Sequence, residues 1–155
     1  MKFSLAAAAL SLAAVAAPVS AEVVRHTTPG STFPILRAVE VPADATLVYL
    51  SGVVPGVANP DADRATAEAW GNTQVQTESV LTRIGENLEA IGLTMSDVVK
   101  MQVYLVADES GSMDFQGFMD GYVKFFGTEE QPNLPTRSVF EVAGLANTQI
   151  GRAHV

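Results

Sequence analysis

Apolar residues recur at helical spacing over residues 66–91, which predicts the first long helix of the chain. The residues that share its apolar side are Thr73, Thr77, Val80, Leu81, Ile84, Leu88 and Ile91. The residues expected on its outer side are Gln76, Arg83, Glu86 and Glu89. Gly92 follows directly and suits the left-handed position just after a helix end. We therefore expect this helix to pack one face on a core.

A second stretch, residues 113–126, has the same spacing and a richer apolar side. Its members are Phe115, Phe118, Met119, Tyr122, Phe125 and Phe126. Gly127 closes the stretch as Gly92 closes the first. An aromatic stripe at this spacing is typical of a core-facing helix, so we predict that these side chains are buried.

Alternating apolar and polar residues predict four strands. The first two are separated by a turn over residues 42–45 and are expected to form a hairpin. The last follows Pro135, which lacks the backbone donor that a strand interior needs. The predicted strands are residues 35–41, 46–51, 100–106 and 136–142.

The last strand divides its side chains between two faces. Phe140 and Val142 would make their face, shared with Ser138, the core face. Arg137 and Glu141 would then lie, with Val139, on the opposite face. The element order β-β-α-β-α-β predicts an α+β fold with both helices on one sheet face. The Arg137 face would stay open, and an open, partly apolar sheet face favours a partner subunit.

Composition narrows the function classes. The chain has 155 residues and 48% hydrophobic content, which suits one domain with a core. It has no cysteine, so disulfides, thiol nucleophiles and cysteine metal sites are excluded. The formal charge is −8 without a basic run, which argues against nucleic acid as a partner. No cofactor or metal ion is expected.

Residues 1–21 resemble a signal peptide. Lys2 supplies a positive start, an alanine-rich apolar run follows over residues 5–17, and Ser20-Ala21 supplies small residues for cleavage. The run is short for a membrane span, although a membrane-anchoring helix is the alternative. We expect cleavage after Ala21, export to a bacterial periplasm, and no membrane attachment afterwards.

The other end of the chain also differs from the rest. Residues 150–155 show neither strand alternation nor a helical face, and they match the translation of a widely used sequencing adapter. We interpret residues 148–155 as a non-native tail, which places the domain at residues 22–147. A natural, unstructured terminus is the alternative.

Arg137 is the main candidate for ligand binding. A guanidinium group presents a fixed fork of donors that matches a carboxylate with two parallel hydrogen bonds. Arg137 could therefore hold a small carboxylate ligand at the start of its strand. The alternative is structural: the guanidinium could pair with Glu141 or another acid and only stabilise the sheet edge.

Four segments together resemble the reactive intermediate deaminase (Rid, YjgF-like, also called endoribonuclease L-PSP-like) family. They are residues 134–138 (LPTRS), 141–145 (EVAGL), 50–55 (LSGVVP), and 97–105 with DVVK and VYL. Each motif is weak alone, but their order and spacing agree with the family from Phe33 to Asn147. The resemblance favours the ligand-binding interpretation of Arg137.

The resemblance implies a trimer around a central barrel, with pockets between subunits that hydrolyse enamines and imines to ketones and ammonia. Arg137 would match the arginine that clamps the substrate carboxylate. Ser51 and Gly52 would match a pocket wall, and Ser138 and Val139 the stretch that contacts the imine. No metal is needed, because a protonated imine is electrophilic enough for a positioned water.

The chain also departs from the family pattern. Ile35 stands where the deaminases usually have a tyrosine, and Met119 stands where their second helix has an asparagine. The family's water-orienting glutamate lies on a strand that would follow Asn147. Three functions therefore stay open: an imine deaminase, a non-catalytic or chaperone-like ligand-binding trimer in the periplasm, and a purely structural oligomer, which would leave Arg137 unexplained.

Overall fold

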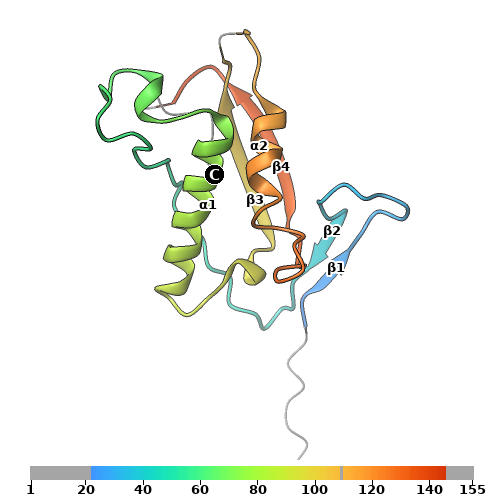
Figure 1. Cartoon of the computed structure of the whole chain (residues 1–155). Helices are drawn as coiled ribbons and strands as arrows, with labels where there is room; N and C mark the ends of the chain where they lie inside the picture. Colours follow the sequence, from blue (N-terminus) through green and yellow to red (C-terminus); the bar gives the residue numbers. More distant parts are fainter. Residues whose placement is uncertain (1–21, 109, 146–155) are drawn as a thin grey trace, which may run out of the picture.

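The computed structural model describes residues 22–108 and 110–145. Two helices and a pair of long strands form its centre, and a small hairpin lies to one side (Figure 1). The predicted signal peptide and the predicted tail lie outside the described residues. The elements in chain order are β1 (Val24–His26), β2 (Ala38–Glu40), η1 (Ala67–Ala69), α1 (Thr73–Glu89), η2 (Met95–Asp97), β3 (Lys100–Val106), α2 (Phe115–Tyr122) and β4 (Thr136–Val142).

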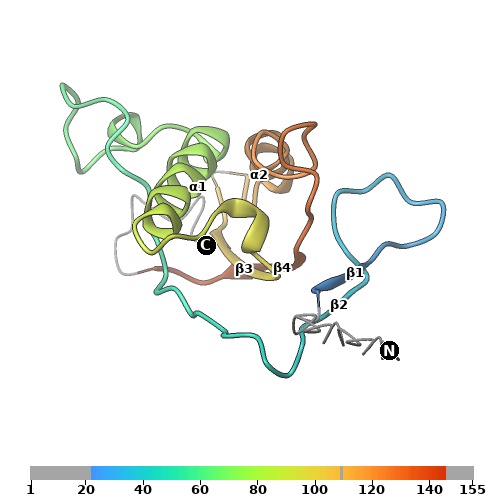
Figure 2. The ribbon, with the colours of Figure 1, turned by 90° about the horizontal axis from the view of Figure 1, so that it is seen from below.

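Strands β3 and β4 run parallel, and both helices cover the same face of this pair (Figure 2). The order of elements, the α+β class and the one-sided helical cover are as predicted. The bounds of β3 and β4 also agree with the predicted ranges 100–106 and 136–142. A right-handed crossover through α2 is the ordinary way to bring two consecutive strands into parallel register.

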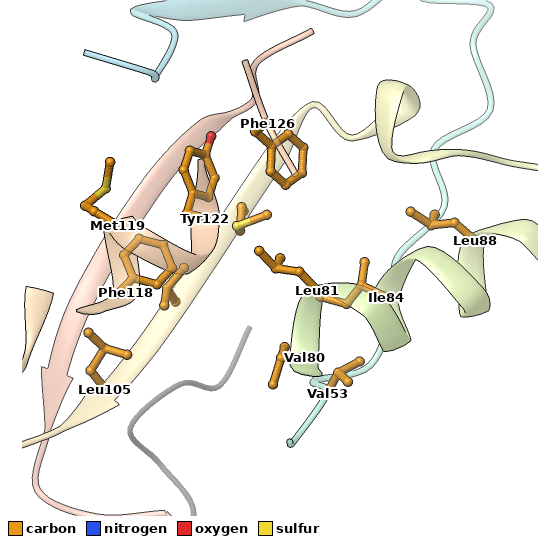
Figure 3. Packing of buried hydrophobic residues seen from close by; sticks show 12 residues of the cluster. Val53, Val80, Leu81, Ile84, Leu88, Leu105, Phe118, Met119, Tyr122 and Phe126 are labelled. Atoms are coloured by element: carbon orange, nitrogen blue, oxygen red, sulfur yellow. The ribbon is translucent and has the colours of Figure 1, made fainter. Parts of the chain in front are cut away.

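The core lies between the helices and the sheet. Apolar side chains of α1 meet the aromatic side chains of α2 there, as Figure 3 shows. Most of the predicted aromatic stripe is buried: Phe118 and Tyr122 have no exposed surface and Phe126 is 1% exposed, whereas Phe115 and Phe125 are half-buried. The buried apolar set is Val53, Val80, Leu81, Ile84, Leu88, Met101, Val103, Leu105, Phe118, Met119, Tyr122 and Phe126.

The first helix is shorter than predicted. It begins at Thr73 and not at Thr66, because Asn72 caps it by accepting a hydrogen bond from the backbone N–H of Val75 at 3.0 Å. Gly71 just before the cap has a φ of 77°, which a continuous helix cannot contain. The helix ends at Glu89, two residues before the predicted end, and Gly92 has the predicted left-handed conformation, with a φ of 79°.

The burial of one residue in α1 and of one residue just after it differs from the prediction. Gln76, expected on the outer side, is fully buried, and its amide nitrogen donates to the backbone oxygen of Gly71 at 2.9 Å. That bond satisfies part of the amide, which makes its burial tolerable. Ile91, expected in the core, is 53% exposed because the helix ends at Glu89 before the apolar side comes round again.

The second helix is also shorter than the predicted residues 113–126. Asp114 caps it by accepting from the backbone N–H of Gly117 at 2.8 Å, and it ends at Tyr122. The chain continues in single turns, in which Phe126 donates its N–H to Tyr122 at 3.2 Å. Phe126 therefore stays in the core although it lies beyond the helix.

The predicted core face of β4 is wrong. Pairing in register places Arg137 beside Met101 and Val139 beside Val103, and both partners on β3 point to the helices. Side chains alternate along a strand, so Phe140 must point the other way, where it is 42% exposed. The open face of the sheet therefore carries Phe140 and not Arg137.

The predicted N-terminal hairpin is also wrong. Strand β2 covers only part of the expected residues 35–41, and it pairs antiparallel with β1, in a stretch where no strand was predicted. The expected second strand, residues 46–51, is exposed and has no regular structure, with Tyr49 88% exposed. A segment rich in strand-forming residues becomes a strand only when another strand pairs with it. Strand propensity alone does not specify that pairing.

In the part of the chain that the structure describes, no helix combines the length and the apolar character needed to cross a bilayer.

Candidate carboxylate-binding site at Arg137

Arg137 is the second residue of β4, and it is 9% exposed. Its guanidinium carbon lies 4.1 Å from the ring centroid of Tyr122 and 4.9 Å from that of Phe118. A third ring, that of Phe33, lies 5.7 Å away. A cation over aromatic faces is attracted by the ring quadrupole, and desolvation strengthens that attraction to about 2 kcal/mol or more. We call these three rings and Arg137 the arginine cage.

The hydrogen bonds of the guanidinium group are incomplete. Nη2 donates to the sulfur of Met119 at 3.2 Å, and a thioether is a weak acceptor. Nη1 is buried and has no hydrogen-bond partner among the described residues. Most buried polar groups in proteins are paired, so a buried guanidinium nitrogen without a partner keeps a donor available for a further acceptor, such as a water molecule or a ligand.

No carboxylate in residues 22–108 and 110–145 forms an ion pair with Arg137. Glu141, the structural partner considered from the sequence, instead accepts a hydrogen bond from the backbone N–H of Met113 at 2.7 Å. Arg137 and Glu141 share a face, but four residues along a strand span about 13 Å. The structural interpretation of Arg137 as the partner of Glu141 is therefore wrong.

Burial changes the ionisation of the cage. It lowers the pKa of Arg137, although the nearby Tyr122 phenol acts in the opposite direction. Burial also raises the pKa of Tyr122 to about 12, a rise that the positive charge of Arg137 limits. The phenol is thus neutral near pH 7 and the guanidinium keeps its charge, since arginine does not lose its proton in proteins. The cage holds one net positive charge.

The N-terminal segment is tied to the cage by backbone interactions. The hydroxyl of Tyr122 donates to the backbone oxygen of Pro34 at 3.1 Å, and the N–H of Leu36 donates to Pro135 at 3.1 Å. Ile35 lies between these two attachments and is half-buried. These attachments hold the backbone on either side of Ile35, and the predicted contact of Ile35 with a ligand stays a prediction.

Of the other residues predicted to contact a ligand, some lie near Arg137 and others do not. Met119 touches the guanidinium directly, and Val139 is half-buried on the same face of β4. Ser138 is exposed on the opposite face. Ser51 and Gly52 are exposed in the segment between β2 and α1, where no hydrogen bond of the described residues joins them to Arg137. Their place in a pocket stays a prediction.

Sequence reasoning missed the role of the aromatic rings. The apolar spacing assigns Phe118 and Tyr122 to the core alone, and Phe33 lies outside every predicted helix and strand. Figure 3 shows Phe118, Met119 and Tyr122 side by side on α2. The spacing of these three residues indicates a common face, but only the register of β4 shows that Arg137 lies under it.

Metal chemistry has no support in this region. Across residues 22–108 and 110–145, His, Asp and Glu side chains nowhere gather in groups of three or more that could hold a metal ion. What the cage offers is a desolvated positive charge with a free donor, which suits binding of an anion.

Comparison with known proteins agrees with this arrangement. The family model described as Endoribonuclease L-PSP matches residues 25–150. A RutC family protein of Haemophilus influenzae is 34% identical over 117 residues, which cover 76% of this chain and 80% of the relative. Reactive Intermediate Deaminase A of Arabidopsis thaliana, a chloroplastic protein, is 34% identical over 136 residues, 87% of this chain and 64% of the relative's length.

A solved structure gives the same result. The crystal structure of E. coli TdcF with bound serine superposes with a TM-score of 0.51 at 27% identity, covering 67% of this chain and 72% of that one. The family match spans well over half of the chain and includes the whole arginine cage. The chain therefore belongs to the Rid (YjgF-like) family, whose model carries the description Endoribonuclease L-PSP.

Proposed function

We propose that this protein binds small 2-oxo or 2-imino acids through Arg137. The observation that carries the proposal is the buried Nη1 of Arg137, which has no partner among the described residues. A ligand carboxylate would satisfy it and would neutralise the charge of the cage. The serine bound to TdcF also carries a carboxylate, which supports a ligand of this class.

The reaction implied by the family is hydrolysis of a 2-imino acid, and binding of its carboxylate by Arg137 would serve that reaction. Water adds to the C=N carbon of a 2-imino acid, the C–N bond breaks, and the products are a 2-oxo acid and ammonia. Arg137 would hold the carboxylate during both steps and keep the imine carbon in one position. The name of the A. thaliana relative, a reactive intermediate deaminase, supports this chemistry for the family.

Binding without turnover is the second candidate. Met119 is an apolar residue in contact with Arg137, and Ile35 stands where the deaminases are expected to have a tyrosine. A guanidinium group binds an anion without activating water. The sulfur of Met119 contacts the guanidinium at the position where an asparagine is expected in the deaminases. We expect the ligand-binding function to be present and the deaminase activity to be low.

Thermal unfolding in the presence of pyruvate or another small 2-oxo acid tests the proposal. A ligand that binds only the folded state raises the melting temperature. The comparison that decides is between the wild-type protein and Arg137→Ala.

Export is the first further part of the proposal. The apolar run of residues 5–17, bounded by Lys2 and by Ser20-Ala21, supports a cleaved signal peptide and a periplasmic protein. N-terminal sequencing of the protein secreted by a bacterial host should begin at Glu22. Mature secreted material that still begins at Met1 contradicts export by this route.

A homotrimer is the second further part. The open face of β3 and β4 carries Phe140, stacked on Tyr104 with ring centroids 5.7 Å apart, together with Gln102 and Ser138. An exposed apolar sheet face supports association between copies. Sedimentation equilibrium of the mature protein should give three times the monomer mass. A monomer at micromolar concentration contradicts the trimer, and aggregation of the 155-residue chain would reflect its unpaired strand edges.

A further inference from the structure

Of the three rings in the arginine cage, only Phe33 reaches the solvent. Phe118 and Tyr122 have no exposed surface, whereas Phe33 is 47% exposed. The two buried rings belong to the packed core between α1 and α2, and Tyr122 is also held by its bond to Pro34. Displacing either of them would disrupt the core. Phe33 therefore forms the solvent-facing side of the cage.

The backbone around Phe33 is anchored by hydrogen bonds. Its N–H donates to the hydroxyl of Ser31 at 3.2 Å, and its carbonyl accepts the N–H of Ile35 at 2.8 Å. The bond from Tyr122 to Pro34 holds the next residue. Phe33 thus has a defined place beside the guanidinium.

The remaining sides of the guanidinium are already occupied. The sulfur of Met119 contacts Nη2, the rings of Phe118 and Tyr122 lie over the group, and β3 lies beside β4. A ligand that reaches Nη1 has to come from the side of Phe33. The atoms attached to the ligand carboxylate would then lie against the Phe33 ring.

We propose that Phe33 is the residue that selects ligands by the size of their side chain. This inference rests on the proposed binding of 2-oxo acids at Arg137. The ring admits a 2-oxo acid with a small side chain and excludes one with a large side chain, because both compete for the same space beside the guanidinium. In this role Phe33 is a specificity-determining residue of the site.

The test compares pyruvate with phenylpyruvate by isothermal titration calorimetry. The full protein is measured as the wild type, Phe33→Ala and Phe33→Leu. We expect the wild type to prefer pyruvate and Phe33→Ala to shift the ratio of the two dissociation constants about tenfold or more toward phenylpyruvate, since apolar pocket contacts discriminate by such factors. Phe33→Leu, which keeps an apolar cover of smaller size, should give an intermediate ratio.

The controls separate this inference from the proposed function. Arg137→Ala should abolish binding of both acids, and Tyr49→Ala, which removes an 88% exposed ring outside the cage, should leave the ratio unchanged. An unchanged ratio in Phe33→Ala, with binding still lost in Arg137→Ala, overturns the role of Phe33 alone. Binding of neither acid by the wild type, or undiminished binding by Arg137→Ala, overturns both proposals.

Discussion

Arg137→Ala is expected to abolish the rise in melting temperature that small 2-oxo acids cause in the wild-type protein. Charge-assisted hydrogen bonds contribute about 1.5–3 kcal/mol each, so losing the carboxylate clamp should weaken binding about tenfold or more. The loss should be large because Arg137 has no substitute: no other cation lies in the arginine cage. Differential scanning fluorimetry over a range of ligand concentrations measures it.

Two other variants at position 137 show which property of the arginine side chain is needed for binding. Arg137→Lys should also weaken binding, because a point charge cannot form two parallel hydrogen bonds in a fixed plane. Arg137→Met fills most of the same volume without a charge. Because Nη1 has no partner, this variant should bind no ligand and yet be as stable as the wild type or more stable without ligand.

A surface arginine serves as the matched control. Arg64 is exposed in the loop before η1, so Arg64→Ala should leave the ligand-induced shift unchanged. If the 2-oxo acids shift the wild type and Arg137→Ala equally, Arg137 is not the clamp. Deaminase activity is measured separately, as ammonia release from an enzymatically generated imino acid. Rapid release that is lost in Arg137→Ala would show that turnover survives with Ile35 and Met119 in place.

Gly121→Ala is expected to destabilise the protein by about 1–3 kcal/mol, as overpacking of a close contact does. Gly121 is buried on α2, where α2 crosses α1. A Cβ atom there would lie 2.8 Å from Cβ of Thr77 and 3.1 Å from the backbone oxygen of Gln74. Thr77 is fully buried and its hydroxyl donates to Thr73 at 2.8 Å, so it cannot turn aside easily. The helices would have to separate.

Gly85→Ala is the matched control, since Gly85 also lies inside a helix. A Cβ at Gly85 would meet only the side chain of Met95, at 3.9 Å, which is ordinary contact. Alanine favours a helix over glycine by about 1 kcal/mol, so this variant should be more stable than the wild type. Urea unfolding of both variants measures the difference. Equal effects of the same sign would contradict the close crossing of α1 and α2 at Gly121.

Much of the fold follows from local patterns. The alternation over β3 and β4, the two apolar helical stripes and the glycines after them act within a few residues, so the sequence alone predicted those elements and their order. The motifs around Arg137 also pointed to the Rid family, and the family match confirms this. Arg137 itself was a candidate from its residue type, because few side chains bind a carboxylate with two donors.

Helix ends were less accessible to sequence reasoning. Thr66 and Phe126 continue the apolar spacing, but the backbone at Gly71 and after Tyr122 leaves the helical path. The buried Gln76 donates a hydrogen bond to the backbone of Gly71, which no periodicity contains. Caps and turns of this kind depend on single hydrogen bonds, so spacing predicts a helix better than it predicts where the helix begins.

Only the tertiary structure decided which way Arg137 points. An alternating strand has two faces, and its sequence does not say which of them the helices cover when both carry apolar residues, as with Val139 and Phe140. The pairing of Val139 with Val103 of β3 settles this: it turns Arg137 under α2 and leaves Phe140 outside. The arginine cage also joins residues more than a hundred positions apart, Phe33 and Arg137. The bonds from Tyr122 to Pro34 and from Leu36 to Pro135 hold Phe33 there, because contacts over such distances are set by packing and not by local sequence.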